Sequence, residues 1–520
     1  MRALALPPDP EIPLIPLALT LVNVALAQGC DEDVANRHFE AGMHALSVRD
    51  AEDGLAALRR CAEAEPDCQR CREHLAYTYA AREEWGMAAA EWTSLGDDPW
   101  ALAASEQVAR HLADTPNPVS KGGLRVPLRE GDSRFQAYDP RPVSPNDHFE
   151  IGVASPKSVR FLASGEKVYV NALEGLKTLV FDPRKLAKAG EILHVFGPDD
   201  ASLFGGQNTV FDYAYRKQSP SGDPNQFGGK PVEMALSHGD RWLWVPYYRR
   251  DFDVGAGSPS AVAIIDTETD AIVRVLPTGP IPKYIAISPD NRWASVTHWG
   301  DNTVALIDIA SGDPARFAYR EQRLVVEYAL NQDKLLKSNR DSACGFCLRG
   351  TVFAPSGQLW VARMGGDGGL AGFDVESGRY LGTVDGIPPN PRHLLIDGDF
   401  LYVTSSRSGH VSKVAVAEVV SKLSAAGAGR VDLDGVRSSH VGAGARTVDI
   451  SADGSALYVA VNARAQVVKL DADTLAVQER WRVDSYPVGL DVSPDGSQVW
   501  VTCQANRGKG GNSITVLAVK

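Results

Sequence analysis

The sequence predicts a mainly β fold, in which a seven-bladed β-propeller follows a small all-α domain. Three observations predict it. Apolar residues recur at helical spacing through residues 31–115, the period changes to two from about residue 148, and one strand–turn–strand unit then recurs seven times. At 520 residues the chain is long enough for two or three domains, and its 44% hydrophobic and 23% charged residues are typical of globular proteins.

The first 27 residues have the pattern of a signal peptide. The run from Ile12 to Ala27 is mostly apolar, and its last three residues form a small-residue cleavage site that would leave Gln28 as the first residue. The pattern predicts an exported protein, either periplasmic or secreted. Cys30 follows a poor lipobox, so we expect no lipid anchor there. No other apolar run has the length that a transmembrane helix needs.

Residues 28–115 form the predicted helical domain. A 34-residue template of paired helices fits twice, with small residues such as Gly42 and Ala88 where helices pack, and with Pro66 ending the first copy. The pattern resembles a short tetratricopeptide (TPR) unit, capped by a third partial helix over Trp100–Ala113. The resemblance implies that this TPR-like unit docks a protein partner in its concave surface. Residues 116–147 are interpreted as a linker.

Residues 148–520 contain the seven predicted blades. Each unit has an apolar strand after a leading proline position, a Ser-Pro-Asp-Gly type turn, a second strand with an aromatic–Val pair, and a third strand ending in Asp. The units begin at Pro156, Pro231, Pro282, Leu348, Pro391, Ala445 and Pro487. The strand Phe149–Ala154 precedes the first unit, and we expect it to close the ring as the outer strand of the last blade.

Aromatic–Val pairs, Pro-Asp-Gly turns and the segment Val304-Ala305-Leu306-Ile307-Asp308 resemble the YVTN family of seven-bladed propellers, which includes YncE-like periplasmic proteins. The resemblance covers residues 148–520, which is most of the chain. It is specific for the fold and weak for function, because propellers include binders, scaffolds, lactonases and redox enzymes.

Superposition of the seven units predicts a basic site. The residues one place after each leading position are Lys157, Val232, Lys283, Arg349, Arg392, Arg446 and Val488. Five of the seven are basic, whereas 53 Lys and Arg in 520 residues would give fewer than one by chance. The loops after the second strands emerge on the same face and add Asn171, Arg249, Arg250, His298, Arg363, Arg407, Asn462, Asn506 and Arg507. Such a face would attract an anionic small molecule or polymer, or an acidic protein surface. The alternative is that these cations pair with carboxylates and serve the structure alone.

The net charge of −12 is concentrated near the N-terminus, since residues 31–120 carry −10 and residues 121–520 carry −1. A nearly neutral propeller argues against a broad nucleic-acid-binding surface. It leaves room for a local basic patch.

The seven cysteines predict disulfides if the protein is exported. Cys30, Cys61, Cys68 and Cys71 would make two bridges of undetermined pairing, with zinc binding as the alternative in a reducing compartment. Cys344 and Cys347 would close a short loop. For this second CxxC the alternatives are a redox-active pair or a metal site that includes Cys503 and His298. Neither CxxC is followed by His, so covalent haem attachment is not predicted.

We therefore expect an exported binding or scaffold protein without a cofactor. The alternative is a propeller enzyme, either a metal- or thiol-dependent oxidoreductase at the CxxC or a lactonase-like hydrolase. A propeller hydrolase typically needs a carboxylate-bound metal in the central channel, where the sequence places basic groups, and this argues against the hydrolase. Two insertions, residues 198–230 and 311–343, are long enough to be functional. The second has a predicted helix around Val325–Leu336 and could cover the basic face.

Overall fold

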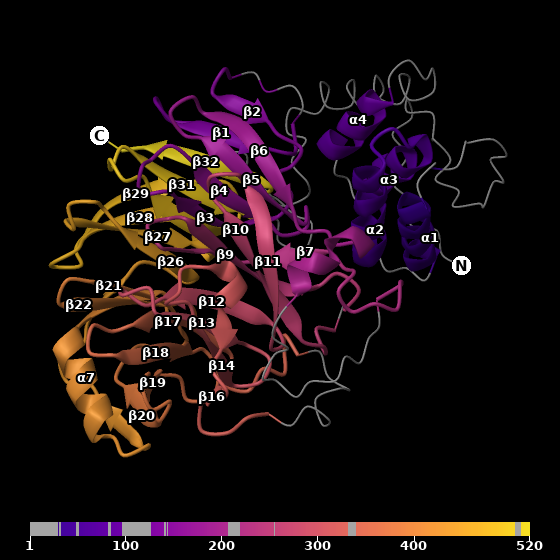
Figure 1. Cartoon of the computed structure of the whole chain (residues 1–520). Helices are drawn as coiled ribbons and strands as arrows, with labels where there is room; N and C mark the ends of the chain where they lie inside the picture. The colour runs from indigo at the N-terminus through magenta and orange to yellow at the C-terminus, as the bar shows by residue number, and fades with distance from the viewer. Residues whose placement is uncertain are drawn as a thin grey trace, which may run out of the picture.

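The computed structural model describes residues 30, 33–47, 51–81, 85–95, 126–139, 142, 144–205, 219–253, 255–330, 340–504 and 511–519. A small group of helices lies against one side of a ring of seven sheets (Figure 1). The predicted fold class is thereby confirmed. The predicted signal peptide and the predicted helix Trp100–Ala113 lie outside the described residues. In the part of the chain that the structure describes, no helix combines the length and the apolar character needed to cross a membrane.

Within the described residues the N-terminal unit contains four helices, and each packs on the next along the chain. They are α1 (Asp33–Ser47), α2 (Ala51–Ala64), α3 (Gln69–Ala81) and α4 (Trp85–Ser94). Gly42 lets α1 and α2 approach closely, because a Cβ at this position would lie 3.0 Å from Cγ of Leu58. Leu58, Tyr79 and Trp92 are fully buried in the core of the unit.

The helical unit docks on blades 1 and 2 through α2. Arg60 forms a buried ion pair with Asp251, and Arg59 donates a hydrogen bond to the backbone carbonyl oxygen of Glu174. Lys177 of blade 1 lies 3.4 Å from the carboxylate of Glu63 on α2. Since a buried ion pair is costly to break on one side, these contacts fix the unit against the ring.

Each blade is one sheet with its strands in chain order from the centre of the ring outward, apart from short additions. Blade 1 contains β3 (Pro156–Phe161), β4 (Val168–Ala172), β5 (Lys177–Asp182) and β6 (Ala187–Leu193). Blade 2 contains β7 (Gly229–Pro231), β8 (Ala235–Ser237), β9 (Trp242–Arg250), β10 (Ser260–Asp266) and β11 (Ala271–Thr278). Blade 3 contains β12 (Pro282–Ile287), β13 (Trp293–His298), β14 (Thr303–Asp308), β15 (Ala318–Tyr319) and β16 (Leu324–Val325).

The remaining four blades follow the same plan. Blade 4 contains β17 (Leu348–Phe353), β18 (Gln358–Arg363), β19 (Leu370–Asp374), β20 (Tyr380–Asp385) and β24 (Arg430–Asp432). Blade 5 contains β21 (Pro391–Asp397), β22 (Phe400–Ser405), β23 (His410–Ala415) and β25 (Arg437–His440). Blade 6 contains β26 (Ala445–Ile450), β27 (Ala456–Val461), β28 (Gln466–Asp471) and β29 (Val477–Arg482). Blade 7 contains β30 (Pro487–Val492), β31 (Gln498–Cys503) and β32 (Ser513–Ala518), joined by β1 (Ser133–Gln136) and β2 (Asp147–Phe149). Six of the seven first strands begin at the residue that the repeat predicts; blade 2 differs, because its inner edge is split between β7 and β8.

The ring is closed by β1, which pairs antiparallel with β32 and places Ser133 opposite Val516. Our expectation that Phe149–Ala154 closes the ring is wrong. Within that segment, the backbone N–H of Val153 bonds to the carbonyl oxygen of Glu150, so the chain turns locally and offers no free edge. β1 is fixed by Arg134, whose guanidinium bonds to Asp147 and lies 3.0 Å from Asp484.

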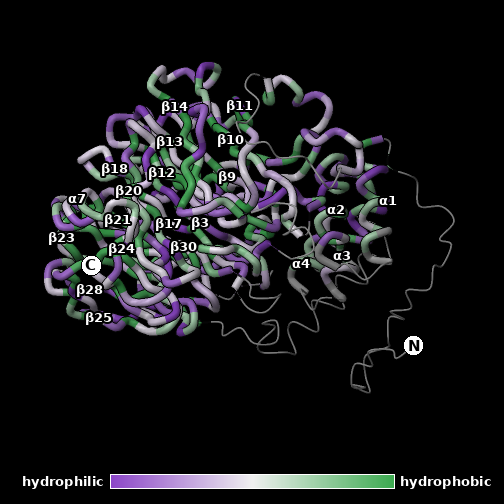
Figure 2. The backbone as a smooth tube through the Cα atoms, turned by 90° about the horizontal axis from the view of Figure 1, so that it is seen from below, coloured by the Kyte–Doolittle hydropathy of each residue, from purple (hydrophilic) through white to green (hydrophobic). Residues whose placement is uncertain are grey.

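Seven hydrophobic clusters hold the ring together, one between each pair of neighbouring blades. The aromatic residue of each aromatic–Val pair is part of this packing: Tyr169, Trp244, Trp360, Tyr402, Tyr458 and Trp500 are all buried between two blades. Hydrophobic stretches accordingly follow the strands, and hydrophilic ones gather in the outer turns (Figure 2). The cluster between blades 7 and 1 continues into the helical unit.

One helix that the sequence analysis did not predict, α7 (Val416–Ala425), packs on blades 4 and 5. Gly372 makes room for it, because a Cβ there would lie 2.5 Å from Leu423 of the helix. The predicted helix around Val325–Leu336 is not helical over its described part, since Val325 belongs to strand β16. Its residues 331–336 lie outside the described residues.

Candidate functional site

In six of the seven blades the first strand begins with the same backbone conformation. The residue before the strand has a left-handed backbone in six blades: Ser155, Ile281, Cys347, Asn390, Gly444 and Tyr486 have φ between 50° and 85°. A positive φ is costly for a β-branched residue such as Ile281, so the surrounding structure must hold it in place. The backbone that leads into the first strand therefore has the same fixed conformation in these six blades.

A β-bulge follows at once, and the predicted basic residue sits in it. On β3 the pairing passes from Pro156 directly to Val159, which leaves Lys157 out of the ladder. The same register shift frees Lys283, Arg349, Arg392 and Arg446 on β12, β17, β21 and β26. Because a bulge turns a side chain away from its normal direction, these five residues point out of the sheets instead of packing between blades.

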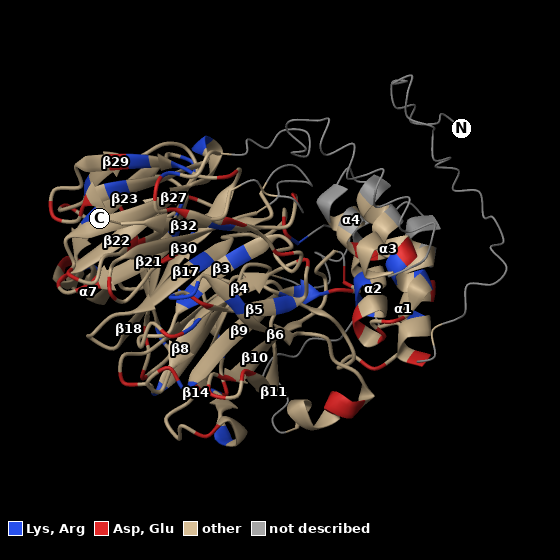
Figure 3. Ribbon diagram, turned by 90° about the horizontal axis from the view of Figure 1, so that it is seen from above, with Lys and Arg blue, Asp and Glu red and all other residues tan. Residues whose placement is uncertain are grey.

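The five basic residues, Lys157, Lys283, Arg349, Arg392 and Arg446, are called the cationic cluster below. Burial lowers the pKa of Lys157 well below its usual value, and the charges of the other four members lower it further. All five side chains are buried or half-buried. Lys and Arg residues gather around β3 and β17 near the centre of the ring (Figure 3). The structure thus brings together the five residues that the repeat alignment selected.

Two members of the cluster have carboxylate partners that the sequence analysis did not find. Lys283 lies 3.1 Å from Asp341, and Arg349 lies 2.9 Å from Glu233. Asp341 belongs to the insertion 311–343, which therefore does reach the basic face. Lys283 also lies 3.9 Å from the centre of the Tyr248 ring.

The other three members contact neutral groups. Lys157 donates a 3.1 Å hydrogen bond to the side-chain oxygen of Gln504, and Arg392 lies 3.4 Å from the sulfur of Met364. The Arg446 guanidinium lies 5.7 Å from the centre of the Tyr486 ring. Among the described residues, none of these three is within ion-pair distance of a carboxylate. The cluster therefore has positive charge that its own partners do not neutralise.

Threonine hydroxyls fix the backbone of the cluster from the neighbouring blade. Thr297 donates a 2.8 Å hydrogen bond to the carbonyl oxygen of Arg349, and Thr404 donates one of 2.5 Å to that of Arg446. Both threonines lie near the end of a second strand, Thr297 in β13 and Thr404 in β22. Blades 3 and 5 thus each position a cation of the next blade.

A second set of polar groups lies on the same inner strands. Arg160 is 2.8 Å from Asp491, and Asp491 accepts a 2.7 Å hydrogen bond from the backbone N–H of Phe161 in the neighbouring blade. Asp449 makes the equivalent 2.8 Å contact with the N–H of Val492. Our expectation of basic groups in place of carboxylates at the centre is therefore wrong. These carboxylates tie the blades together. Asp449 and Asp491 stand three residues after Arg446 and Val488, so aligning that position of the seven units would have found them.

Asp449 and Asp491 also share a proton. Burial raises the pKa of Asp491 to about 8, with Arg160 opposing this and Asp449 adding to it. Burial raises the pKa of Asp449 as well. Since two neighbouring buried carboxylates cannot both ionise, the pair retains one proton near neutral pH.

Tyr284 and His393, each next to a cluster residue in sequence, are hydrogen bonded to one another. The backbone N–H of Val448 donates to Nδ1 of His393, with a length of 3.4 Å. Burial, aided by nearby arginines, lowers the pKa of His393 to about 3, so the ring is neutral and carries its proton on Nε2. Nε2 then donates to Tyr284, whose own hydroxyl proton remains available to another acceptor.

Three further predicted site residues do not join the cluster. His298 is fully buried, and its two ring nitrogens are each hydrogen bonded over 2.8 Å, one to Thr278 and one to Thr303. Its role is therefore structural. Arg363 is also buried and lies 2.6 Å from Glu327. Arg407 is exposed in the turn after β22. Of the other loop residues, Asn171 and Arg250 are buried, and Asn506 and Arg507 lie outside the described residues.

The predicted disulfides are present as Cys30–Cys68, Cys61–Cys71 and Cys344–Cys347. Cys503 is unpaired and fully buried, and burial raises the pKa of its thiol well above the usual value, which makes it unreactive. In the described part of the chain, the one group of three or more potential metal ligands is the set of four cysteines in the helical unit. The alternative metal site at Cys344, Cys347 and Cys503 therefore has no three-ligand arrangement.

No family model matches the sequence, and no curated protein matches it. Among solved structures, the chain is similar to hydrazine synthase of Kuenenia stuttgartiensis, with 15% identity and a TM-score of 0.47 over 73% of this chain and 99% of that one. It is also similar to the Cps50 (Swd1) β-propeller domain of Myceliophteria thermophila, with 13% identity and a TM-score of 0.46 over 71% of this chain and 98% of that one. Similarities this distant carry no argument about function.

Proposed function

We propose that the propeller is a binding module whose cationic cluster holds an anionic group of a small molecule, a polymer or an acidic protein surface. The observation that supports this most is the set of five buried or half-buried cations within electrostatic reach of one another, only two of which have a carboxylate partner among the described residues. Like charges gathered out of water destabilise the fold, and a bound anion would offset that cost.

The chemistry of the cluster favours carboxylate or phosphate groups. Arg349, Arg392 and Arg446 each present a planar fork that matches two oxygens of such a group. The bulges and the threonine hydrogen bonds hold the backbone of these residues before any ligand arrives. A preorganised site of this kind loses little entropy when it binds.

The test is calorimetric titration of the whole chain with tripolyphosphate and with an oligoglutamate peptide, each at two salt concentrations. The wild type should bind at least one of them, more weakly at high salt. The triple variant Arg349→Gln, Arg392→Gln, Arg446→Gln should bind it at least about a hundredfold more weakly, because each lost charged hydrogen bond costs about 1.5–3 kcal/mol. The exposed Arg407→Gln is the matched control and should bind normally. If the folded triple variant binds the anion as tightly as the wild type does, the proposal is wrong.

We further propose that the protein is exported and belongs with the YncE-like YVTN propellers. Three disulfides, two of them inside the small helical unit, support an oxidising compartment. Mass spectrometry of the protein from its own cells tests this, since export predicts a chain that begins at Gln28 and lacks free thiols other than Cys503.

The helical unit is proposed to be a TPR-like docking unit for a protein partner. Its consecutive packed helices support this, as does its attachment to the ring through α2, which leaves α1 away from the blades. Cross-linking in the exported fraction should capture one protein with the wild type and lose it with Glu40→Lys on α1. A control change on blade 1, Lys185→Glu, should keep it.

A further inference from the structure

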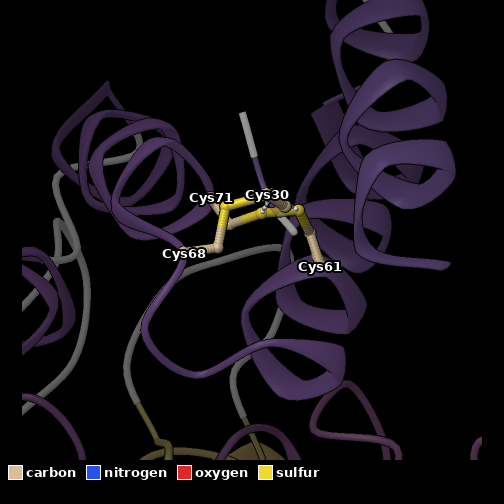
Figure 4. Close-up of side chains that lie close together, drawn as sticks. All are labelled: Cys30, Cys61, Cys68 and Cys71. Atoms are coloured by element: carbon tan, nitrogen blue, oxygen red, sulfur yellow. Dashed lines mark hydrogen bonds between the residues drawn. A yellow bond between two sulfur atoms is a disulfide. The ribbon is translucent and has the colours of Figure 1, made fainter. Parts of the chain in front are cut away.

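The four cysteines of the helical unit gather in one buried place (Figure 4). Cys30 precedes α1, Cys61 lies on α2, Cys68 precedes α3 and Cys71 is in the first turn of α3. Each is at most 6% exposed, and the four sulfur atoms all lie within 4.8 Å of one another. Three separate parts of the chain thus contribute to a single cluster of sulfur atoms.

This arrangement is more compact than two disulfides require. The bridges join Cys30 to Cys68 and Cys61 to Cys71. Two disulfides in one unit need not contact each other. Instead, the sulfur of Cys30 lies 3.2 Å from that of Cys71 and 4.0 Å from that of Cys61, across the two bridges. The bridges therefore lie against each other.

The dimensions fit a tetrahedral metal ion. A zinc ion bound by four thiolates at about 2.3 Å has neighbouring sulfur atoms about 3.8 Å apart. Reduction moves the bonded sulfurs apart to non-bonded contact, and the cross-bridge separations are already near this value. We propose that the reduced chain binds one zinc ion through Cys30, Cys61, Cys68 and Cys71.

The surroundings favour thiolates and a soft divalent metal. Cys68 and Cys71 sit at the N-terminus of α3, whose first turn contains Arg70 and Arg72 and no acidic residue. Helix N-termini and neighbouring arginines lower the pKa of a thiol. Four sulfur ligands in a closed, buried site are the ligand set of structural zinc and exclude magnesium and calcium.

The chemistry of binding is simple. Four zinc–sulfur bonds form, and the four thiol protons of the reduced chain pass to solvent. The ion would then connect the segment before α1 with α2 and α3, as the disulfides do in the oxidised chain. The reduced unit would keep its fold in this way. This inference is independent of the cationic cluster.

The test uses the full chain, reduced with a phosphine under argon and titrated with Co²⁺ and then Zn²⁺. The wild type should develop the intense visible absorption of tetrahedral cobalt thiolate, saturating at one equivalent, and zinc should bleach it. Cys61→Ser should lose this spectrum. The matched control, the double variant Cys344→Ser, Cys347→Ser, alters the other CxxC and should keep it.

A measurement on the wild type covers the case in which Cys61→Ser does not fold. Bound zinc should protect the four cysteines from alkylation, and a chelator should expose them, while Cys344 and Cys347 react equally in both conditions. The proposal is overturned if the reduced wild type shows no tetrahedral cobalt spectrum at one equivalent. It is equally overturned if only the Cys344, Cys347 variant loses that spectrum, or if zinc leaves the four cysteines as reactive as the chelator does.

Discussion

The hydroxyl of Thr502 on β31 donates a 2.8 Å hydrogen bond to the carbonyl oxygen of Lys157 on β3, and so joins the last blade to the first. The same hydroxyl accepts a 3.0 Å hydrogen bond from the backbone N–H of Gly489. Thr297 and Thr404 make the equivalent contacts with Arg349 and Arg446. One side chain of the repeat thus links the stability of the ring to the position of its central cations.

We expect Thr502→Val to destabilise the protein by about 1–3 kcal/mol, because a buried carbonyl oxygen and a buried N–H both lose their partner. Chemical denaturation measures this change. Thr502→Ser keeps the hydroxyl and should retain most of the stability. Equal stability of the two variants would mean that the hydrogen bond contributes nothing and that only packing matters.

Anion binding at the cluster should strengthen as the pH falls through about 7. Burial lowers the pKa of Lys283 to about 7, with Asp341 opposing this and Arg349 adding to it. Below that pH Lys283 carries its charge, and a bound anion favours the charged form. The affinity should therefore rise by up to about tenfold per pH unit around this pKa. Titrations at several pH values measure it. Lys283→Met should flatten the profile, and the exposed Lys185→Met should leave it as in the wild type.

The shared proton of Asp449 and Asp491 should make the folded protein less stable as the pH rises. The folded pair keeps this proton up to about pH 8. In the unfolded chain an aspartate loses its proton at about pH 3.9. Between these values the folded state binds more protons, so the free energy of unfolding falls with rising pH, by at most about 1.4 kcal/mol per unit.

Asp449→Asn should remove that pH dependence, because the amide can donate to Asp491 and still accept from the N–H of Val492. Urea midpoints between about pH 5 and about pH 8 test it. A variant with the same slope as the wild type would show that the proton is held elsewhere.

Closure of the ring should depend strongly on Arg134. Its side chain is 3% exposed, and Arg134→Met would leave Asp147 and Asp484 buried without their cation, at a cost of about 3–5 kcal/mol. Lys185→Met is the control, since Lys185 is 79% exposed and pairs with Asp182 away from β1, and it should cost about 0–1 kcal/mol. Similar effects in the two variants would argue against a special role for β1.

Much of the ring follows from the sequence because it repeats. A leading residue, a cation and an aromatic–Val pair recur at similar spacings, so a strand that is poorly marked in one unit is recognised by comparison with the others. Hence Pro156 and Pro487 begin strands as predicted, and Lys157 feels the charge of Arg446 although 289 residues of sequence separate them.

The sequence analysis missed the features that do not belong to the repeat. β1 has four residues and no periodicity, and its partner β32 lies at the other end of the chain, so nothing local marks it as a strand. Asp341 reaches Lys283 from an irregular insertion, and no repeat unit predicts its position. The pairing of Cys30 with Cys68 likewise depends on how three helices pack, which is a property of the tertiary structure.

The pairing of Ser133 with Val516 also has a consequence for how the protein reaches this state. β1 is synthesised before the first blade and β32 after the rest of the last one, so their contact has the greatest sequence separation in the ring. Folding slows as such distant contacts increase. Until the final strand emerges, blade 7 is incomplete and strand edges remain open, and open edges are where chains pair with one another and aggregate. The synthesis of β32 therefore decides whether the ring closes on itself or on a neighbour.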